Sequence, residues 1–260
     1  MSAAKPIAQR ITGALGAAAA ACAAVVVGVG LAHAQEEIPT YTATYDVEYK
    51  GRDVGESVQS LVRDGDRYRF RSVTQARGLA RLLRSRPVIE ESVFDLHGGE
   101  PRPLEFRLED GTRKGEDNVA IEFDWAAGLA HVTAEDGRVD VPLEPGVHDR
   151  ATLQLALMLE LADAAAPASH ALIDDGSVKT YSYEIAGEET LATPAGTHDT
   201  IKVVQRREGS SRHTIIWLAP DLRHLPVKIE QRRDDEILTT LLLESVQGLG
   251  DTNPNEQGHR

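Results

Sequence analysis

Cysteine is almost missing from this chain of 260 residues, and its scarcity excludes several kinds of site. The single cysteine, Cys22, lies in an N-terminal apolar run, and residues 35–260 contain none. We therefore expect no disulfide, no catalytic thiol and no thiolate-bound metal in that part of the chain. Its free energy of folding has to come from a packed core, for which a hydrophobic fraction of 41% is sufficient.

Long apolar runs and positive charge are also scarce. One segment, residues 11–31, is uncharged over a length close to that of a bilayer span, so a protein with several membrane spans is excluded. The chain has 28 Lys and Arg residues against 41 Asp and Glu residues, which gives a formal net charge of -13. Sequence-independent nucleic-acid binding requires a positive face, and we therefore expect no nucleic-acid partner.

The N-terminus has the pattern of a secretory signal peptide. Lys5 and Arg10 precede the apolar run, and Ala32-His33-Ala34 follows it with small residues at the two positions that a signal peptidase reads. A retained membrane anchor is the alternative, but the run is rich in Ala and Gly and the cleavage site follows it directly. We predict a signal peptide over residues 1–34, cleavage after Ala34, a periplasmic location and no membrane span after cleavage.

Apolar and polar residues alternate with a period of two over most of residues 40–246. In YTATYDVEY at residues 41–49, for example, one face is aromatic and the other is polar. Short runs of this kind, separated by Gly and Asp turns, are typical of an antiparallel meander. We expect strands at residues 41–49, 54–62, 67–74, 88–96, 104–108, 119–125, 129–133, 139–143, 180–186, 188–193, 200–207, 213–218, 227–233 and 237–246.

One segment, DRATLQLALMLELA at residues 149–162, breaks this period and consists of strong helix formers, with Asp149 placed as the N-cap. Its leucines lie on more than one side, so the helix should be covered on most sides. We predict a mainly β fold, an antiparallel meander forming an open barrel or strongly curved sheet, with this one main apolar helix across its mouth or concave face. A single domain would span residues 35–246, followed by a disordered tail at 247–260.

Motifs for catalysis or metal binding are not found in residues 35–260. They contain no H-E-x-x-H, G-x-S-x-G, S-x-x-K or G-x-x-x-x-G-K, and their histidines form no pair at metal-ligand spacing. Consecutive acidic residues such as Glu90-Glu91 point to opposite faces of a strand, so they cannot act as an acid and base pair. We expect no catalytic residue, no metal and no cofactor.

The remaining functional feature is an apolar interior, which is either a filled core or a cavity. A filled core is the commoner outcome, but a curved sheet plugged by an apolar helix would suit a carrier of an acyl chain. The candidate ligand-binding residues are Tyr45, Phe70, Phe123, Trp125, Leu153, Leu157, Leu161 and Trp217. A second apolar stretch, Gly78-Leu79-Ala80-Arg81-Leu82-Leu83, is either one helical turn or an exposed loop at a rim.

The order of several short motifs resembles an exported bacterial family, the domain-of-unknown-function 3108 family (DUF3108). The matching pieces are YTATYDV at 41–47, VGE at 54–56, ESVF at 91–94, FDW at 123–125, DR at 149–150, TPAGT at 193–197, IKV at 201–203, WLAPD at 217–221 and LPVKI at 225–229. The resemblance implies a periplasmic all-β domain, and by fold analogy an open half-barrel similar to those of lipoprotein carriers and sensors. It brings no catalytic residues.

The leading hypothesis is a periplasmic, non-catalytic binding protein for a lipid, an acyl chain or another apolar envelope component. One alternative is a structural or protein-interaction module of the cell envelope with a filled core, which would have an envelope protein as its partner. The other is an unrecognised hydrolase, with His148, His198 or His224 as the base.

Overall fold

The computed structural model describes residues 38–82 and 84–249. The signal peptide predicted over residues 1–34 lies outside the described residues, as do residues 250–260 of the predicted tail. Within the described part, Gln247 still belongs to the last strand and Leu249 packs against the core, so the ordered chain extends three residues past the predicted boundary.

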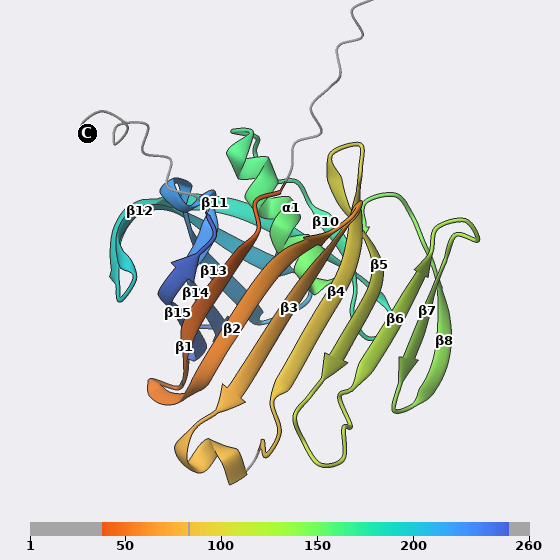
Figure 1. Cartoon of the computed structure of the whole chain (residues 1–260), viewed down its shortest axis with the longest axis horizontal. Coiled ribbons are helices and arrows are strands. Elements are labelled where there is room, and N and C mark those ends of the chain that lie inside the picture. The colour runs from red at the N-terminus through yellow and green to blue at the C-terminus, as the bar shows by residue number, and fades with distance from the viewer. Residues whose placement is uncertain (1–37, 83, 250–260) are drawn as a thin grey trace, which may run out of the picture. The chain divides into compact units, whose positions relative to one another are not determined.

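The described residues form fifteen strands, one α-helix and two short 3-10 helices (Figure 1). The first group of strands is β1 (Tyr41–Tyr49), β2 (Arg52–Asp64), β3 (Arg67–Ala76), β4 (Val88–His97), β5 (Glu100–Glu109), β6 (Val119–Asp124), β7 (Leu129–Ala134), β8 (Gly137–Pro142) and β9 (Val147–His148). The second group is β10 (His170–Ile173), β11 (Val178–Thr193), β12 (Gly196–Arg207), β13 (Arg212–Ala219), β14 (Leu225–Arg233) and β15 (Glu236–Gln247). The helices are η1 (Gly78–Leu82), α1 (Arg150–Ala162) and η2 (Pro220–Leu222).

All fifteen strands belong to one sheet in the order β8-β7-β6-β5-β4-β3-β2-β1-β15-β14-β13-β12-β11-β10-β9. Neighbouring strands are antiparallel except β9 and β10, which are parallel. Strand β1 pairs with β15 and thereby joins the two halves of the meander, while β8 and β9 are the edges of the sheet. Figure 1 shows the sheet curving around α1. The predicted antiparallel, strongly curved sheet with one main helix is therefore confirmed.

The period of two in the sequence sets the faces of the strands. In β1, Tyr41, Ala43, Tyr45 and Val47 are buried while the residues between them are not. Tyr49 departs from this pattern, because it ends the strand beside the β1–β2 turn and its side chain is 51% exposed. The alternation therefore predicts the inward face correctly except at the strand end, where no neighbour covers the ring.

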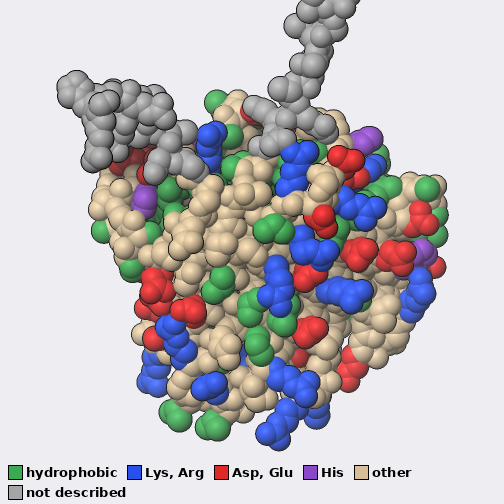
Figure 2. All heavy atoms as spheres, in the orientation of Figure 1, with side chains coloured by type: hydrophobic (Ala, Val, Ile, Leu, Met, Phe, Trp, Pro, Cys, Tyr) green, Lys and Arg blue, Asp and Glu red, His purple; other side chains and the backbone are tan. Residues whose placement is uncertain are grey.

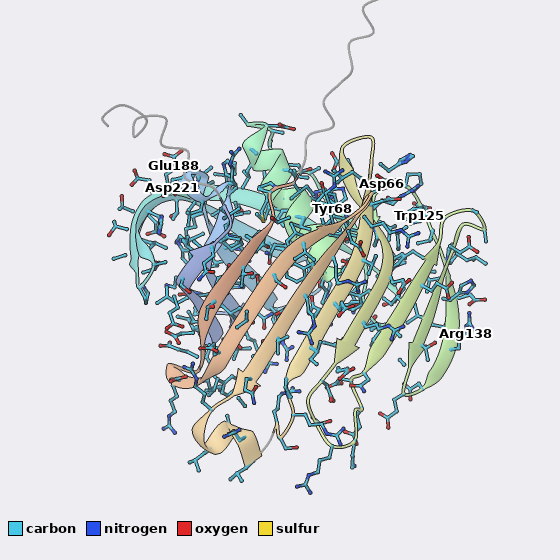
Figure 3. The ribbon with its side chains drawn as sticks, in the orientation of Figure 1. Asp66, Tyr68, Trp125, Arg138, Glu188 and Asp221 are labelled. Carbon is cyan, nitrogen blue, oxygen red and sulfur yellow. The ribbon has the colours of Figure 1, made fainter. Side chains whose placement is uncertain are left out.

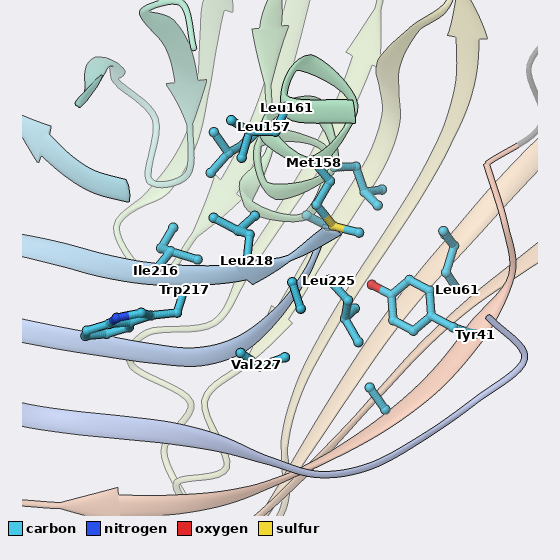
Figure 4. Close-up of a cluster of buried hydrophobic side chains, with 14 of the residues drawn as sticks. Tyr41, Leu61, Leu157, Met158, Leu161, Ile216, Trp217, Leu218, Leu225 and Val227 are labelled. Atoms are coloured by element: carbon cyan, nitrogen blue, oxygen red, sulfur yellow. The ribbon is translucent and has the colours of Figure 1, made fainter. Parts of the chain in front are cut away.

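Helix α1 lies on the concave face of the sheet, where it contacts β4, β5, β9 and β10. Asp149 is its N-cap as predicted, and a capping box links it to Thr152. Leu155 and Leu157 are each 1% exposed, so the helix is covered on more than one side. Figure 4 shows Leu157, Met158 and Leu161 of α1 over a layer of strand residues that includes Leu218 and Leu225.

Two features of the strand pattern were not predicted. The runs at 180–186 and 188–193 form one strand, β11, with an irregularity of pairing between Ile185 and Gly187. Strands β9 and β10 were not predicted, because they are short and their pairing depends on residues distant in sequence. A second buried cluster, formed by β5–β8 together with Val147 and Ile173, is separate from the main one.

Candidate functional site

A cavity of about 640 Å³ lies inside the curved sheet, next to the N-terminal half of α1. Its wall is built from α1 and from strands β2–β4 and β10–β15. Ligand pockets for small molecules usually measure about 300–1,000 Å³. The interior is therefore hollow on this side of α1 and large enough for a ligand, whereas it is filled by side chains on the other.

One part of the cavity wall is apolar. Leu153 and Leu157 of α1 face it, and Phe70 of β3 faces it from the sheet. Strands of the second half contribute the remaining apolar wall residues, which are Leu172, Ile216, Ile229, Leu238 and Leu241. This wall gives the cavity a surface on which a hydrocarbon portion of a ligand can lose its contact with water.

The rest of the wall is polar and carries mainly positive charge. The cationic side chains are Arg150, Lys179, Arg207, Arg212 and Arg232, and the carboxylates are Glu90 and Asp174. The chain as a whole has a formal charge of -13, so the cavity has the opposite sign to the protein around it. A surrounded patch of this sign attracts anions and concentrates them near the wall.

Some of these cations are paired. Nζ of Lys179 lies 2.5 Å from Oδ1 of Asp174, Arg150 approaches Oδ2 of the same carboxylate at 3.5 Å, and Arg232 is paired with Glu230.

Two of the cations, in contrast, are unpaired. Arg207 and Arg212 have no Asp or Glu carboxylate within 4.0 Å among the described residues. They occupy the last position of β12 and the first position of β13, on either side of a tight turn. Arg207 and Arg212 are therefore neighbours across this turn at one end of the cavity, where Arg207 is partly buried, Arg212 is exposed, and neither guanidinium group is paired with a carboxylate.

Glu90 is a carboxylate of the cavity wall whose pKa is strongly perturbed. It lies half-buried on β4, and loss of solvation raises the pKa of its carboxyl to about 7. The charge of Arg150 lowers this pKa, whereas the carboxylates of Asp149 and Asp174 raise it. Glu90 therefore changes its charge near neutral pH within a site that is otherwise positive.

A pair of buried histidines adjoins the cavity. The rings of His148 and His170 are 5.1 Å apart, and His170 also packs edge-on against Tyr183, whose hydroxyl accepts a hydrogen bond from Gln205. Burial lowers the pKa of His148 to about 4, with a smaller contribution from the nearby His170. Nε2 of His170 lies 3.1 Å from Oε1 of Glu160, which belongs to α1. Because Tyr183 and Gln205 line the cavity, this cluster connects α1 to its wall.

The predicted ligand-binding residues fall into three groups. Phe70, Leu153 and Leu157 line the cavity, as a binding role requires. Tyr45 and Leu161 are buried in the main core without lining it, and the Tyr45 hydroxyl donates a 2.9 Å hydrogen bond to the Pro226 carbonyl.

The third group consists of three aromatic residues that do not line the cavity, although Trp217 belongs to the same main buried cluster as Tyr45. Phe123 and Trp125 belong to the second cluster, beside β5 and β6 as Figure 3 shows for Trp125. The indole of Trp217 points away from α1 in Figure 4, and the ammonium groups of Lys202 and Lys228 lie 5.1 and 4.6 Å from its ring centre. The sequence pattern identified aromatic strand faces but not which cluster each one joins.

The three histidines that the hydrolase hypothesis named have other surroundings. His148 is buried beside His170, Nδ1 of His198 lies 2.8 Å from Oδ2 of Asp221, and burial lowers the pKa of His224. Among the described residues, no serine or threonine hydroxyl is hydrogen-bonded to any of the three.

Sequence reasoning missed the cationic side of the cavity. It gave no role to Arg207, Arg212 or Lys179, and Lys179 and Arg212 each lie one residue outside a predicted strand. A usable signal was the pairing of polar residues at like positions of adjacent strands, for example Gln205 with Thr214. Such pairs repeated over several strands indicate a wetted inner face.

Among residues 38–82 and 84–249, no helix is both long enough and apolar enough to cross a membrane. In the same residues, no group of three or more His, Cys, Asp or Glu side chains is arranged to hold a metal ion.

Comparison with solved structures finds several similar chains. A β-barrel-like protein of domain of unknown function DUF1849 from Brucella abortus has 10% sequence identity and a TM-score of 0.49, with coverage of 81% of this chain and 98% of that chain. A protein with a YmcC-like fold from Bacteroides fragilis has 11% identity and a TM-score of 0.37, with coverage of 81% and 97%. MucB has 11% identity and a TM-score of 0.36, with coverage of 85% and 57%.

A search of curated proteins finds no significant match to this chain. A family comparison, in contrast, matches residues 44–242 to the family described as "Protein of unknown function (DUF3108)". The matched segment runs from β1 to β15 and includes α1 and every strand that lines the cavity. The protein therefore belongs to the DUF3108 family.

Proposed function

We propose that this protein is a non-catalytic binding protein of the periplasm whose cavity holds an anionic amphiphile. The apolar part of the ligand lies against Leu153, Leu157 and Phe70, and its anionic group lies near Arg207 and Arg212. This narrows the hypothesis of a lipid or acyl-chain ligand, because a purely apolar molecule would leave the charged part of the wall without a partner. The periplasmic location rests on the signal pattern of residues 1–34.

The observation that carries the proposal is the presence of two unpaired guanidinium groups on the wall of a cavity in an acidic protein. Holding Arg207 and Arg212 close together without a carboxylate costs electrostatic free energy. A bound anion would offset this cost by accepting charge-assisted hydrogen bonds, which are about twice as strong as neutral ones. The acidic exterior of the protein would repel the same anion, so the anion would bind in the cavity in preference to the rest of the surface.

The apolar wall of the cavity favours binding of the hydrocarbon part of the same ligand. Leu153 and Leu157 are 5% and 1% exposed, and Phe70 is 3% exposed, so little of each side chain reaches the cavity. An alkyl chain or ring placed against this wall gains about 25 cal/mol for each Å² of apolar area that it buries.

The test is calorimetric titration of the protein with dodecyl phosphate and with dodecyltrimethylammonium, each below the concentration at which it aggregates. We expect the anionic probe to bind and the cationic probe not to bind. Arg207→Ser and Arg212→Ser should each weaken binding of dodecyl phosphate about tenfold, because a charged hydrogen bond is removed. Arg138→Ser, on the exposed edge strand β8, is the matched control and should bind as the unchanged protein does.

Equal binding of the two probes would contradict the proposal, since the charge of the cavity would then play no part. Unchanged binding in both arginine variants would contradict it as well. Native mass spectrometry of protein isolated from a periplasm, followed by denaturing extraction, would then identify the class of any molecule that copurifies.

A further inference from the structure

The tip formed by η1 carries the two most exposed large apolar side chains that the structure describes. Leu79 is 84% exposed and Leu82 is 82% exposed, whereas the other large exposed apolar side chains are between 37% and 51% exposed. Single exposed leucines are common on protein surfaces. Two of them on a helix of five residues, with no buried residue in that helix, form an apolar tip instead of a packing face.

The tip is also positively charged. Between Gln75 and Glu90 the sequence contains four arginines and no carboxylate. Arg77 is paired with Glu56 and, at 3.5 Å, with Asp46. The other three, Arg81, Arg84 and Arg86, have no Asp or Glu carboxylate within 4.0 Å among the described residues, so their charge is not neutralised by direct pairing.

The segment that follows the tip is fixed to the rest of the sheet. The guanidinium group of Arg84 donates to the main-chain carbonyl of Asp110, and the main-chain nitrogen of Arg86 donates to the Gly111 carbonyl at 3.1 Å. The carboxylate of Asp110 is buried and accepts hydrogen bonds from Thr112. The apolar tip is therefore held out from the sheet by a defined loop contact rather than folded against the surface.

The position of η1 relates it to the cavity. It connects β3 and β4, whose inward residues Phe70, Thr74 and Glu90 line the cavity wall. The β1–β2 turn lies at the same end of these strands, as Figure 1 shows, and pairs with the start of β15, where Leu238 also lines the cavity. Figure 2 shows apolar side chains at this lower end, next to several Lys and Arg side chains.

We infer that this tip docks on an anionic lipid bilayer, with Leu79 and Leu82 entering the interface and the arginines contacting lipid phosphates. An interfacial element of this kind gains affinity from buried apolar area together with attraction between basic residues and anionic lipids. The strongly acidic remainder of the chain is repelled by the same surface, so docking would turn this end of the sheet toward the membrane. The inference goes beyond the proposed ligand and does not depend on it.

A bilayer fits this tip better than an acidic protein partner does. The two leucines project from a convex tip, and the cavity wall does not include them. A protein partner would have to provide a matching pocket for each side chain, whereas a bilayer accepts any convex apolar tip. The excess of arginine over carboxylate in residues 76–89 matches the charge of an anionic membrane surface.

The experiment is flotation of the full chain with vesicles of phosphatidylcholine alone and of phosphatidylcholine mixed with phosphatidylglycerol. We expect preferential binding to the anionic vesicles, and roughly tenfold weaker partitioning in Leu79→Ser/Leu82→Ser and in Arg81→Ser/Arg86→Ser. The matched control for the leucines is Val62→Ser/Val139→Ser, because these two valines are each 46% exposed and lie outside the tip. The matched control for the arginines is Arg138→Ser. Both controls should float as the unchanged protein does.

A second measurement reports on the tip alone. In Leu82→Trp, the added indole should be quenched by vesicles that contain brominated acyl chains, beyond the quenching seen for the native Trp125 and Trp217. All variants share the same N-terminus, so any contribution of residues 1–37 to flotation is common to them. If the added indole is not quenched and the tip variants float normally, the inference is wrong, and an acidic protein partner becomes the occupant to test. Neither result bears on dodecyl phosphate binding, which is measured without vesicles.

Discussion

Ser92 and Asp149 lie 57 residues apart in the sequence, and the Ser92 hydroxyl donates a hydrogen bond of 2.5 Å to Oδ2 of Asp149. Both residues are fully buried. Asp149 is also the N-cap of α1, where Oδ1 accepts the main-chain N–H of Thr152 at 2.8 Å. One carboxylate thus joins β4 to the start of the helix, and it fixes the end of α1 that lines the cavity.

We predict that Asp149→Ala destabilises the fold by about 2–4 kcal/mol, because it removes the cap and leaves the Thr152 N–H and the Ser92 hydroxyl without a partner. Ser92→Ala should cost less, about 1–2 kcal/mol, because the cap is retained. Urea unfolding gives both values. Ser177→Ala, which removes an exposed 2.9 Å hydrogen bond to Asp175, is the control. Equal stability of the Asp149 and Ser177 variants would show that the buried carboxylate does not hold α1.

Glu90 should make the stability of the protein depend on pH. Its pKa is about 7 in the folded protein against an ordinary value of 4.5 for a glutamate, so ionisation is disfavoured by folding. The contribution of Glu90 to the free energy of unfolding is therefore most favourable below pH 4.5, where the carboxyl is protonated in both states. It becomes less favourable as the pH rises through about 7. Glu90→Gln should therefore raise the free energy of unfolding at pH 8 by about 1–2 kcal/mol, a value reduced because the cavity admits solvent. The gain should vanish near pH 4.5.

Urea unfolding of Glu90→Gln at pH 8, 6 and 5 measures this effect. Glu91→Gln is the control, since Glu91 is the next residue of β4 and pairs instead with Arg69 on the outer side. Its loss should cost at most about 1 kcal/mol at any of these pH values. A gain for Glu90→Gln that does not change with pH would mean that the carboxyl is ionised normally in the cavity.

His148 should act in the opposite sense. Its pKa falls from 6.5 to about 4 on folding, so between these values the unfolded chain binds a proton that the folded chain does not. The free energy of unfolding therefore has its full value, as far as His148 determines it, above pH 6.5, and it decreases as the pH falls toward 4. We expect a loss of about 2 kcal/mol between pH 7 and pH 5. His148→Gln should remove most of this loss, whereas His97→Gln, at the exposed end of β4, should not.

Alternation of apolar and polar residues and helix propensity are local patterns, so they predict only those parts of the fold that depend on nearby residues. The strand β1 and the helix α1 were predicted with their boundaries and, for α1, with the capping residue Asp149, because these features depend on neighbours within a few positions. Strand β9 has two residues and pairs in parallel with β10, so its formation depends on contacts that no local pattern records.

The candidate site was predicted only in its apolar half. A period of two separates the faces of a strand, but it assigns the polar face to bulk solvent by default. In an open curved sheet, water also reaches the concave face, so Arg207 and Arg212 have the same local pattern as surface residues. Phe123 and Trp125 show the converse problem, because an apolar face is recognised without knowing which of two clusters it joins.

Gly55 of β2 lies unusually close to the backbone of the neighbouring strand β3. A Cβ atom on Gly55 would lie closer to the main-chain oxygen of Gln75 than real Cβ contacts allow. Gly55 pairs with Ala76 at the point where β3 ends and the chain turns toward η1, so the strand backbones approach closely there. In an ordinary strand, replacing Gly with Ala removes a cost of roughly 0.5–1 kcal/mol. At this position we expect Gly55→Ala to destabilise the fold by about 1–3 kcal/mol, because the backbone would have to shift.

Urea unfolding measures the change, and Ser60→Ala on the same strand is the control. A stabilised Gly55→Ala would mean that β2 and β3 separate without cost, and that this glycine is not required by their packing.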